Sequence, residues 1–168
     1  MNLKIYSNNH YAETIFRYLG TQIGIPGTIN NSCNVVRDFW HHHGVDMHSA
    51  ILKDGCGLAP QDAVSASTLV QLLTYMYKSK YSVQWMASLP VSGESGTLAG
   101  FLRGTALQGR VHAKSGTIAG TKNFAGYIDM PNGNKLCFAV LINSAPGKAR
   151  NIQPVIAQYL LDVYQRNQ

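Results

Sequence analysis

The chain has 168 residues, of which 45% are hydrophobic and 13% are charged. This length suits a single domain with a substantial core, and the composition excludes a long disordered tract. The net charge of +6 favours an anionic partner. The basic residues are scattered and form no finger, RNP or KH motif, so the sequence predicts no nucleic-acid binding.

The cysteine content and the N-terminal residues further limit the class of protein that this chain can be. The three cysteines, Cys33, Cys56 and Cys137, are too few for a full disulfide framework, and their lack of C-x-x-C spacing argues against structural zinc. Residues 1–6 turn polar at once, so we expect no secretory signal in this chain, and no stretch is long enough to span a membrane. The chain is therefore expected to be cytoplasmic if Met1 is the true start; otherwise its export signal lies on preceding sequence.

The first third of the chain predicts two helices. Residues 7–13 form a loop that turns into a helix, capped by Ser7 or Asn9 and ended by Gly20. Residues 28–33 are expected to be a polar loop, and residues 34–43 a short helix closed by Gly44. The apolar face expected for the first helix comprises Ala12, Ile15, Phe16 and Leu19.

Histidines 41, 42, 43 and 48 raise the possibility of a metal site. Consecutive histidines point in different directions around a helix, so they do not converge on one ion. We favour an exposed helix end, where histidine suits the C-terminal dipole. No metal or other cofactor is predicted.

The middle of the chain alternates turns and helices. A short strand at residues 50–52 is expected to lead into the glycine-dense turn Asp54-Gly55-Cys56-Gly57-Leu58. Helices are predicted from Ser65 or Ser67 to Lys78, over residues 82–89 and over residues 97–103, the last after a turn-rich loop at residues 90–96.

From Gly109 onward the pattern changes to strands. Residues 111–118, 122–129 and 135–143 are apolar or alternating runs, and Pro131-Asn132-Gly133-Asn134 is a hairpin turn. After Pro146-Gly147, a helix over residues 149–164 is expected to pack across the resulting antiparallel sheet. We expect its inward face to comprise Ile152, Val155, Ile156, Tyr159, Leu160 and Val163. The prediction is an α+β fold in one domain, 1–168, without repeats or linkers.

The run Lys114-Ser115-Gly116-Thr117 lies on the first of these strands. A lysine there offers a cation to an anionic carboxylate, and the serine adds a hydroxyl donor. The glycine lets a substrate backbone pair with the strand edge, and the Thr117 N–H could serve an oxyanion hole. Alone, the triplet Lys114-Ser115-Gly116 is weak evidence for such a site, because an exposed strand end with a turn glycine can have the same sequence.

Five segments in a fixed order give the triplet its significance. Together they resemble the penicillin-binding-protein-4 type of serine D-alanyl-D-alanine carboxypeptidase/endopeptidase. The segments are Ser7-Asn8-Asn9, which is followed by Tyr11-Ala12-Glu13; Asp54-Gly55-Cys56-Gly57-Leu58; Gly93-Glu94-Ser95-Gly96-Thr97-Leu98; Arg110-Val111-His112-Ala113-Lys114-Ser115-Gly116-Thr117; and Ala125-Gly126-Tyr127. The resemblance implies the C-terminal portion of a β-lactamase/transpeptidase-like fold.

The resemblance also implies roles for individual residues. Ser7 would relay protons to the leaving group and Asn9 would bind the substrate amide. Lys114, with Ser115, Gly116 and Thr117, would bind the terminal carboxylate of a peptidoglycan stem peptide ending in D-Ala-D-Ala. β-Lactams would bind the parent enzyme, and the family's location is periplasmic or extracytoplasmic.

Two departures from the family pattern affect the expected activity. The nucleophilic serine of the family belongs to an S-x-x-K motif, and no serine here has a lysine three residues later. Cys56 replaces the usual serine of its turn, but without a predictable histidine partner it is a poor substitute nucleophile. We therefore expect this chain alone to be inactive, with the nucleophile on a missing segment. The alternatives are a non-catalytic module that binds stem peptides, and a fragment that self-associates through an exposed sheet edge.

Overall fold

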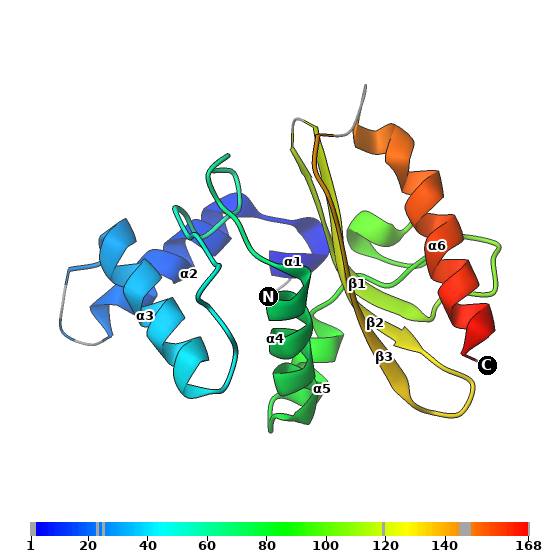
Figure 1. The fold of residues 1–168 in the computed structure, drawn as a ribbon, viewed down its shortest axis with the longest axis horizontal. Helices are drawn as coiled ribbons and strands as arrows, with labels where there is room; N and C mark the ends of the chain where they lie inside the picture. Colours follow the sequence, from blue (N-terminus) through cyan, green and yellow to red (C-terminus); the bar gives the residue numbers. More distant parts are fainter. Residues whose placement is uncertain (1–2, 23, 25, 119, 145–148, 168) are drawn as a thin grey trace. The chain divides into compact units, whose positions relative to one another are not determined.

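The computed structural model describes residues 3–22, 24, 26–118, 120–144 and 149–167 (Figure 1). It divides into two compact units, one of residues 1–6 and 76–168, the other of residues 7–75. Among the described residues, no helix combines the length and apolarity needed to cross a membrane.

The unit of residues 7–75 contains helices α2 (Asn9–Thr21) and α3 (Ile29–His42) and most of α4 (Ala66–Lys78). The predicted cap of α2 is wrong: Asn8, rather than Ser7 or Asn9, accepts the Tyr11 N–H, at 3.0 Å. Asn8 performs this role because its backbone is extended and its side-chain oxygen reaches a free N–H of the first turn.

Helix α3 begins at Ile29, so the loop predicted for residues 28–33 is wrong beyond Thr28. Thr28 caps the helix by accepting the Asn31 N–H at 3.2 Å. The polar first turn then packs closely on α2, since a Cβ at Gly20 would lie 2.7 Å from Ser32 Oγ. Close packing of this kind is invisible to a periodicity analysis. The predicted inner face of α2 is also only partly correct: Phe16 is buried, whereas Ile15 and Leu19 are exposed.

The other unit is built on an antiparallel sheet of β1 (Val111–Ile118), β2 (Thr121–Asp129) and β3 (Lys135–Ile142), in that order. Helix α6 (Gln153–Arg166) lies across one face of the sheet (Figure 1). The three predicted strands and the α+β class are confirmed. The core between sheet and helix includes Val111, Phe124, Ile128, Ile156 and Leu160.

Some predicted details of this unit are wrong. On α6, the predicted Ile156 and Leu160 are buried, but Val155 and Tyr159 are exposed, and Tyr164 joins the inner face. The helix predicted over residues 97–103 is only a 3₁₀ turn, η1 (Gly96–Leu98), and the left-handed backbone at Leu102 (φ 60°) prevents a helix from continuing through that residue. The remaining elements are α1 (Leu3–Tyr6), α5 (Ser82–Ala87) and η2 (Ala149–Ile152).

The strand predicted at residues 50–52, in the unit of residues 7–75, is reduced to one isolated bridge between Ile51 and Ala63. The predicted break at Pro146-Gly147 lies outside the described residues.

Candidate active site

The outer edge of β1, opposite β2, is covered over only half its length. Ala113 N–H donates to the Pro90 carbonyl at 3.1 Å, and Ser92 N–H donates to the Val111 carbonyl at 2.9 Å. Alternate residues of a strand direct their backbone groups to the same edge, so Ser115 and Thr117 direct theirs outward as well. Within the described part of the chain, no backbone carbonyl accepts either N–H. An extended peptide could therefore pair with this edge as an added strand.

Lys114 places a cation beside this open edge. Its ammonium group donates to the carbonyl of Ser115. Burial, and then the positive charge of Lys122, lower the pKa of Lys114. No carboxylate in the described ranges forms an ion pair with Lys114. The strand thus holds a partly desolvated cation that an anionic ligand would stabilise.

Two hydroxyl groups follow Lys114 on the strand, and each has a partner that sequence reasoning missed. Ser115 Oγ donates to Thr97 Oγ1 at 3.2 Å, and Thr117 Oγ1 accepts from Lys122 Nζ at 2.7 Å. Lys122 lies directly opposite Thr117 in the β1–β2 register. The tight connection between the two predicted strands could have indicated this pairing.

Gly116 leaves free space on the strand. A Cβ built there meets no described atom within 4 Å, whereas one built at Gly126 would lie 2.1 Å from the His112 carbonyl oxygen. Glycine in a strand interior is unfavourable unless close packing or a ligand requires it. Packing accounts for Gly126, while Gly116 offers room for a ligand backbone.

A partly buried network supports β2. Trp85 Nε1 donates to Tyr127 Oη at 2.9 Å. Lys4 Nζ lies 3.1 Å from the centre of the Trp85 ring and donates to Ser88 Oγ at 2.8 Å. Burial lowers the pKa of Lys4 to about 8 and raises the pKa of Tyr127. These contacts join α1 and α5 to the sheet.

Ser7 and Asn9 belong to the other unit, that of residues 7–75. Ser7 is half-buried and has a left-handed backbone (φ 53°) between α1 and α2. Asn9 is the exposed first residue of α2. Both side chains are polar and lie near a helix start, which suits hydrogen bonding to a ligand and to the backbone equally.

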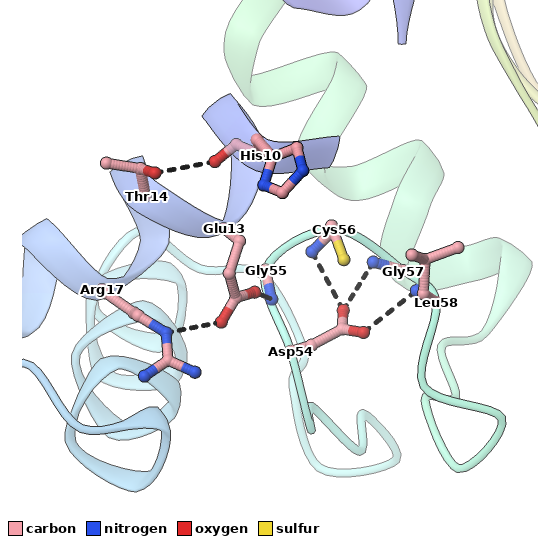
Figure 2. Close-up of polar contacts among 9 residues, drawn as sticks. All are labelled: His10, Glu13, Thr14, Arg17, Asp54, Gly55, Cys56, Gly57 and Leu58. Carbon is pink, nitrogen blue, oxygen red and sulfur yellow. Dashed lines mark hydrogen bonds and ion pairs between the residues drawn. The ribbon is translucent and has the colours of Figure 1, made fainter. Parts of the chain in front are cut away.

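The glycine-dense turn in this second unit is organised around Asp54 (Figure 2). Its Oδ1 accepts from the N–H groups of Cys56 (2.9 Å) and Gly57 (2.5 Å), and its Oδ2 from Leu58 (3.0 Å) and Ala59 (2.7 Å). Burial alone would raise the pKa of Asp54, but these N–H groups, together with a side-chain hydrogen bond from Asp62, outweigh it and lower the pKa. The turn is therefore held by a carboxylate with backbone partners on both oxygens.

Glu13, Asp54 and Cys56 bring potential metal ligands within 4.8 Å of one another. Glu13 accepts from Arg17 Nε at 2.8 Å and from the Gly55 N–H at 2.8 Å (Figure 2). Since both carboxylates already accept N–H groups on each oxygen, their arrangement is explained by the loop itself. Burial, followed by the nearby acidic charges, raises the pKa of the Cys56 thiol, which disfavours the thiolate needed for nucleophilic attack.

Comparison with known proteins places this geometry in a family. The chain is 38% identical over 149 residues to a D-alanyl-D-alanine carboxypeptidase of an Actinomadura species, covering 86% of the chain and 28% of that protein. It is 29% identical over 140 residues to the D-alanyl-D-alanine carboxypeptidase DacB of Haemophilus influenzae, covering 82% and 29%. The chain thus spans less than a third of the length of either relative.

Solved structures that are similar to this chain support the same relationship. Penicillin-binding protein 4 of Haemophilus influenzae, in complex with a β-lactam, superposes with a TM-score of 0.89 at 25% identity, covering 97% of the chain and 40% of that protein. A TLA-1 β-lactamase variant shares the fold with a TM-score of 0.72 at 22% identity, covering 98% and 61%. The predicted β-lactamase/transpeptidase-like fold is therefore confirmed.

The family model described as the D-Ala-D-Ala carboxypeptidase 3 (S13) family matches residues 1–163. This match covers nearly the whole chain, including the strand with Lys114 and the turn with Asp54. The chain belongs to the D-Ala-D-Ala carboxypeptidase 3 (S13) family, as the resemblance of its motifs predicted.

Proposed function

We propose that this chain supplies the carboxylate-binding part of a D-Ala-D-Ala carboxypeptidase site that acts on peptidoglycan stem peptides. The observation that carries the proposal is Lys114, a partly desolvated cation without a carboxylate partner in the described residues, beside the open edge of β1. A peptide that ends in a carboxylate provides both an anion and a backbone able to pair with a strand.

In the proposed complex the terminal carboxylate accepts from the Lys114 ammonium and from the hydroxyls of Ser115 and Thr117. The Ser115 hydroxyl then gives up its donation to Thr97 Oγ1 and donates to the carboxylate instead. The peptide backbone lies along the outer edge of β1, where Gly116 leaves space. The Thr117 N–H then faces the scissile carbonyl and can stabilise negative charge on its oxygen.

The remaining roles follow from family membership. We assign Ser7 to proton relay and Asn9 to the substrate amide. The 168-residue sequence has no S-x-x-K motif, so we infer that hydrolysis needs a serine that these residues do not contain. The chain by itself is then a module that binds the stem peptide without cleaving it. Its substrate places its work at the cell wall, outside the cytoplasmic membrane.

Fluorescent penicillin tests this proposal together with a binding measurement. We expect no covalent adduct by intact mass, and reversible binding of an N-acylated peptide ending in D-Ala-D-Ala, measured by calorimetry. The variant Lys114→Ala should lose that binding. A stable penicillin adduct would show that another residue, such as Cys56, has taken over as nucleophile.

A second candidate role is self-association through the sheet. No strand in the described ranges pairs with the outer edge of β3, and unpaired edges attract further strands. Sedimentation over a wide concentration range distinguishes this role from peptide binding. A chain that stays monomeric throughout would exclude self-association.

A further inference from the structure

Lys122 is a buried cation whose position the family motifs do not explain. The residue is only 8% exposed, although it lies on β2 directly opposite the exposed Thr117. Its ammonium group lies 5.2 Å from the centre of the Phe124 ring. Within the part of the chain that the structure describes, no carboxylate forms an ion pair with it. Burying an ammonium without a counter-ion is unfavourable, so the burial of Lys122 at this position needs an explanation.

The contact between Lys122 and Thr117 has a fixed direction. An ammonium group can only donate, so at 2.7 Å Thr117 Oγ1 must accept from it. The hydroxyl proton of Thr117 is then directed away from Lys122 and is available to another acceptor. Because Thr117 is exposed on the strand that carries Lys114, that acceptor can be a ligand anion.

The two lysines also act on each other. The positive charge of Lys122 lowers the pKa of Lys114, so the two ammonium groups repel across this end of the sheet. An anion beside Lys114 relieves both the repulsion and the desolvation, whereas an uncharged ligand relieves neither.

We propose that Lys122 is a positioning residue of the carboxylate site, which holds the Thr117 hydroxyl as a donor to the substrate carboxylate and adds a second positive charge beside Lys114. The inference rests on the proposed function, since it names a further residue of the same site. It predicts that the site selects for the charge of the peptide terminus more strongly than Lys114 alone would.

The test compares two ligands on the full 168-residue chain: an N-acylated peptide ending in D-Ala-D-Ala, and the same peptide with its terminal carboxylate converted to an amide. Calorimetry gives both affinities for the wild type, Lys122→Met, Lys122→Arg and Thr117→Val. Lys80→Met is the matched control, because it removes the same charge from an exposed position in the same unit. Thermal unfolding shows which variants fold.

We expect Lys122→Met to weaken binding of the acid about tenfold, the loss of roughly one charge-assisted hydrogen bond, and to leave the amide unchanged. Thr117→Val should have a similar effect, and the double variant should lose less than the sum, because the two residues act through one hydroxyl. Lys122→Arg should recover most of the affinity, and Lys80→Met should bind like the wild type.

The outcomes separate the two proposals. A wild type that binds acid and amide equally contradicts the proposed function. A wild type that prefers the acid, with an equal preference in Lys122→Met, contradicts only the role of Lys122. If the peptide does not bind, a titration with acetate followed at the Thr117 amide resonance decides: no shift in the wild type, or the same shift in Lys122→Met, overturns the inference.

Discussion

The outer edge of β1 and the turn around Asp54 both hold charge that is partly removed from water, but they satisfy it differently. Asp54 accepts four backbone N–H groups from its own turn. Lys114 donates to the Ser115 carbonyl and has no carboxylate partner among the described residues. A charge that is satisfied within the chain stabilises the fold, whereas a charge without a counter-ion is available to bind a ligand. Substitutions at the edge of β1 should therefore affect ligand binding, whereas substitutions in the turn around Asp54 should affect the free energy of unfolding.

The largest effect is expected from Lys114→Ala. Losing a charge-assisted contact to the carboxylate should weaken binding of the D-Ala-D-Ala peptide about 100-fold. The free energy of unfolding should not fall, because Lys114 forms no ion pair with the residues that the structure describes. Calorimetry and urea denaturation measure the two quantities, with Lys80→Ala as the control. Intact binding with reduced stability would show that Lys114 is structural.

Asp54→Asn should have the opposite effect: it should lower the free energy of unfolding and leave peptide binding intact. Replacing the carboxylate should lower the free energy of unfolding by about 2 kcal/mol at pH 7, since hydrogen bonds to a charged group are lost. The folded pKa of Asp54 lies below its ordinary value of 3.8, so its stabilisation is complete above that value and is lost as pH falls through the folded pKa. Urea denaturation at pH 7 and pH 3 measures it, with the exposed Asp38→Asn as control. A difference from the wild type that does not shrink in acid would contradict this account.

Two glycines on neighbouring strands sharpen the comparison. Gly126→Ala should destabilise the chain by about 2 kcal/mol, because its Cβ would collide with the His112 carbonyl. Gly116→Ala should stabilise it by about 0.5 kcal/mol, the usual gain over glycine, yet weaken peptide binding. Thermal unfolding and calorimetry measure these changes. Equal destabilisation by both variants would mean that Gly116 also serves packing.

The smallest effect concerns Lys4, a half-buried cation that does have partners within the chain, Ser88 and the Trp85 ring. Burial lowers its pKa to about 8 from 10.5, so the folded chain disfavours its charged form. The unfolded chain binds the extra proton between these values, so this contribution to stability improves as pH rises from about 8 to 10.5. Denaturation midpoints across this range should rise more for the wild type than for Lys4→Met. Parallel curves would contradict the shift.

The sequence predicted the sheet better than the helices. The strands are apolar or alternating runs, and Pro131-Asn132-Gly133-Asn134 marks the turn between the second and the third, so local pattern sufficed to place them. The start of α3 and the inner face of α6 depend on what each helix packs against. Val155 and Tyr159 fit a helical period but are exposed, since the sheet meets the face of Ile156 and Leu160 instead.

The candidate site shows the same division. The sequence by itself determined the family, the strand that carries Lys114 and the hydroxyl residues that follow it, because these depend on local motifs and their order. Only the tertiary structure revealed that Lys122 is buried opposite Thr117 and that Thr97 meets Ser115. Burial and missing counter-ions are properties of surroundings that assemble from distant segments. The sequence around a lysine does not indicate which acceptors will lie within hydrogen-bond distance of its ammonium group.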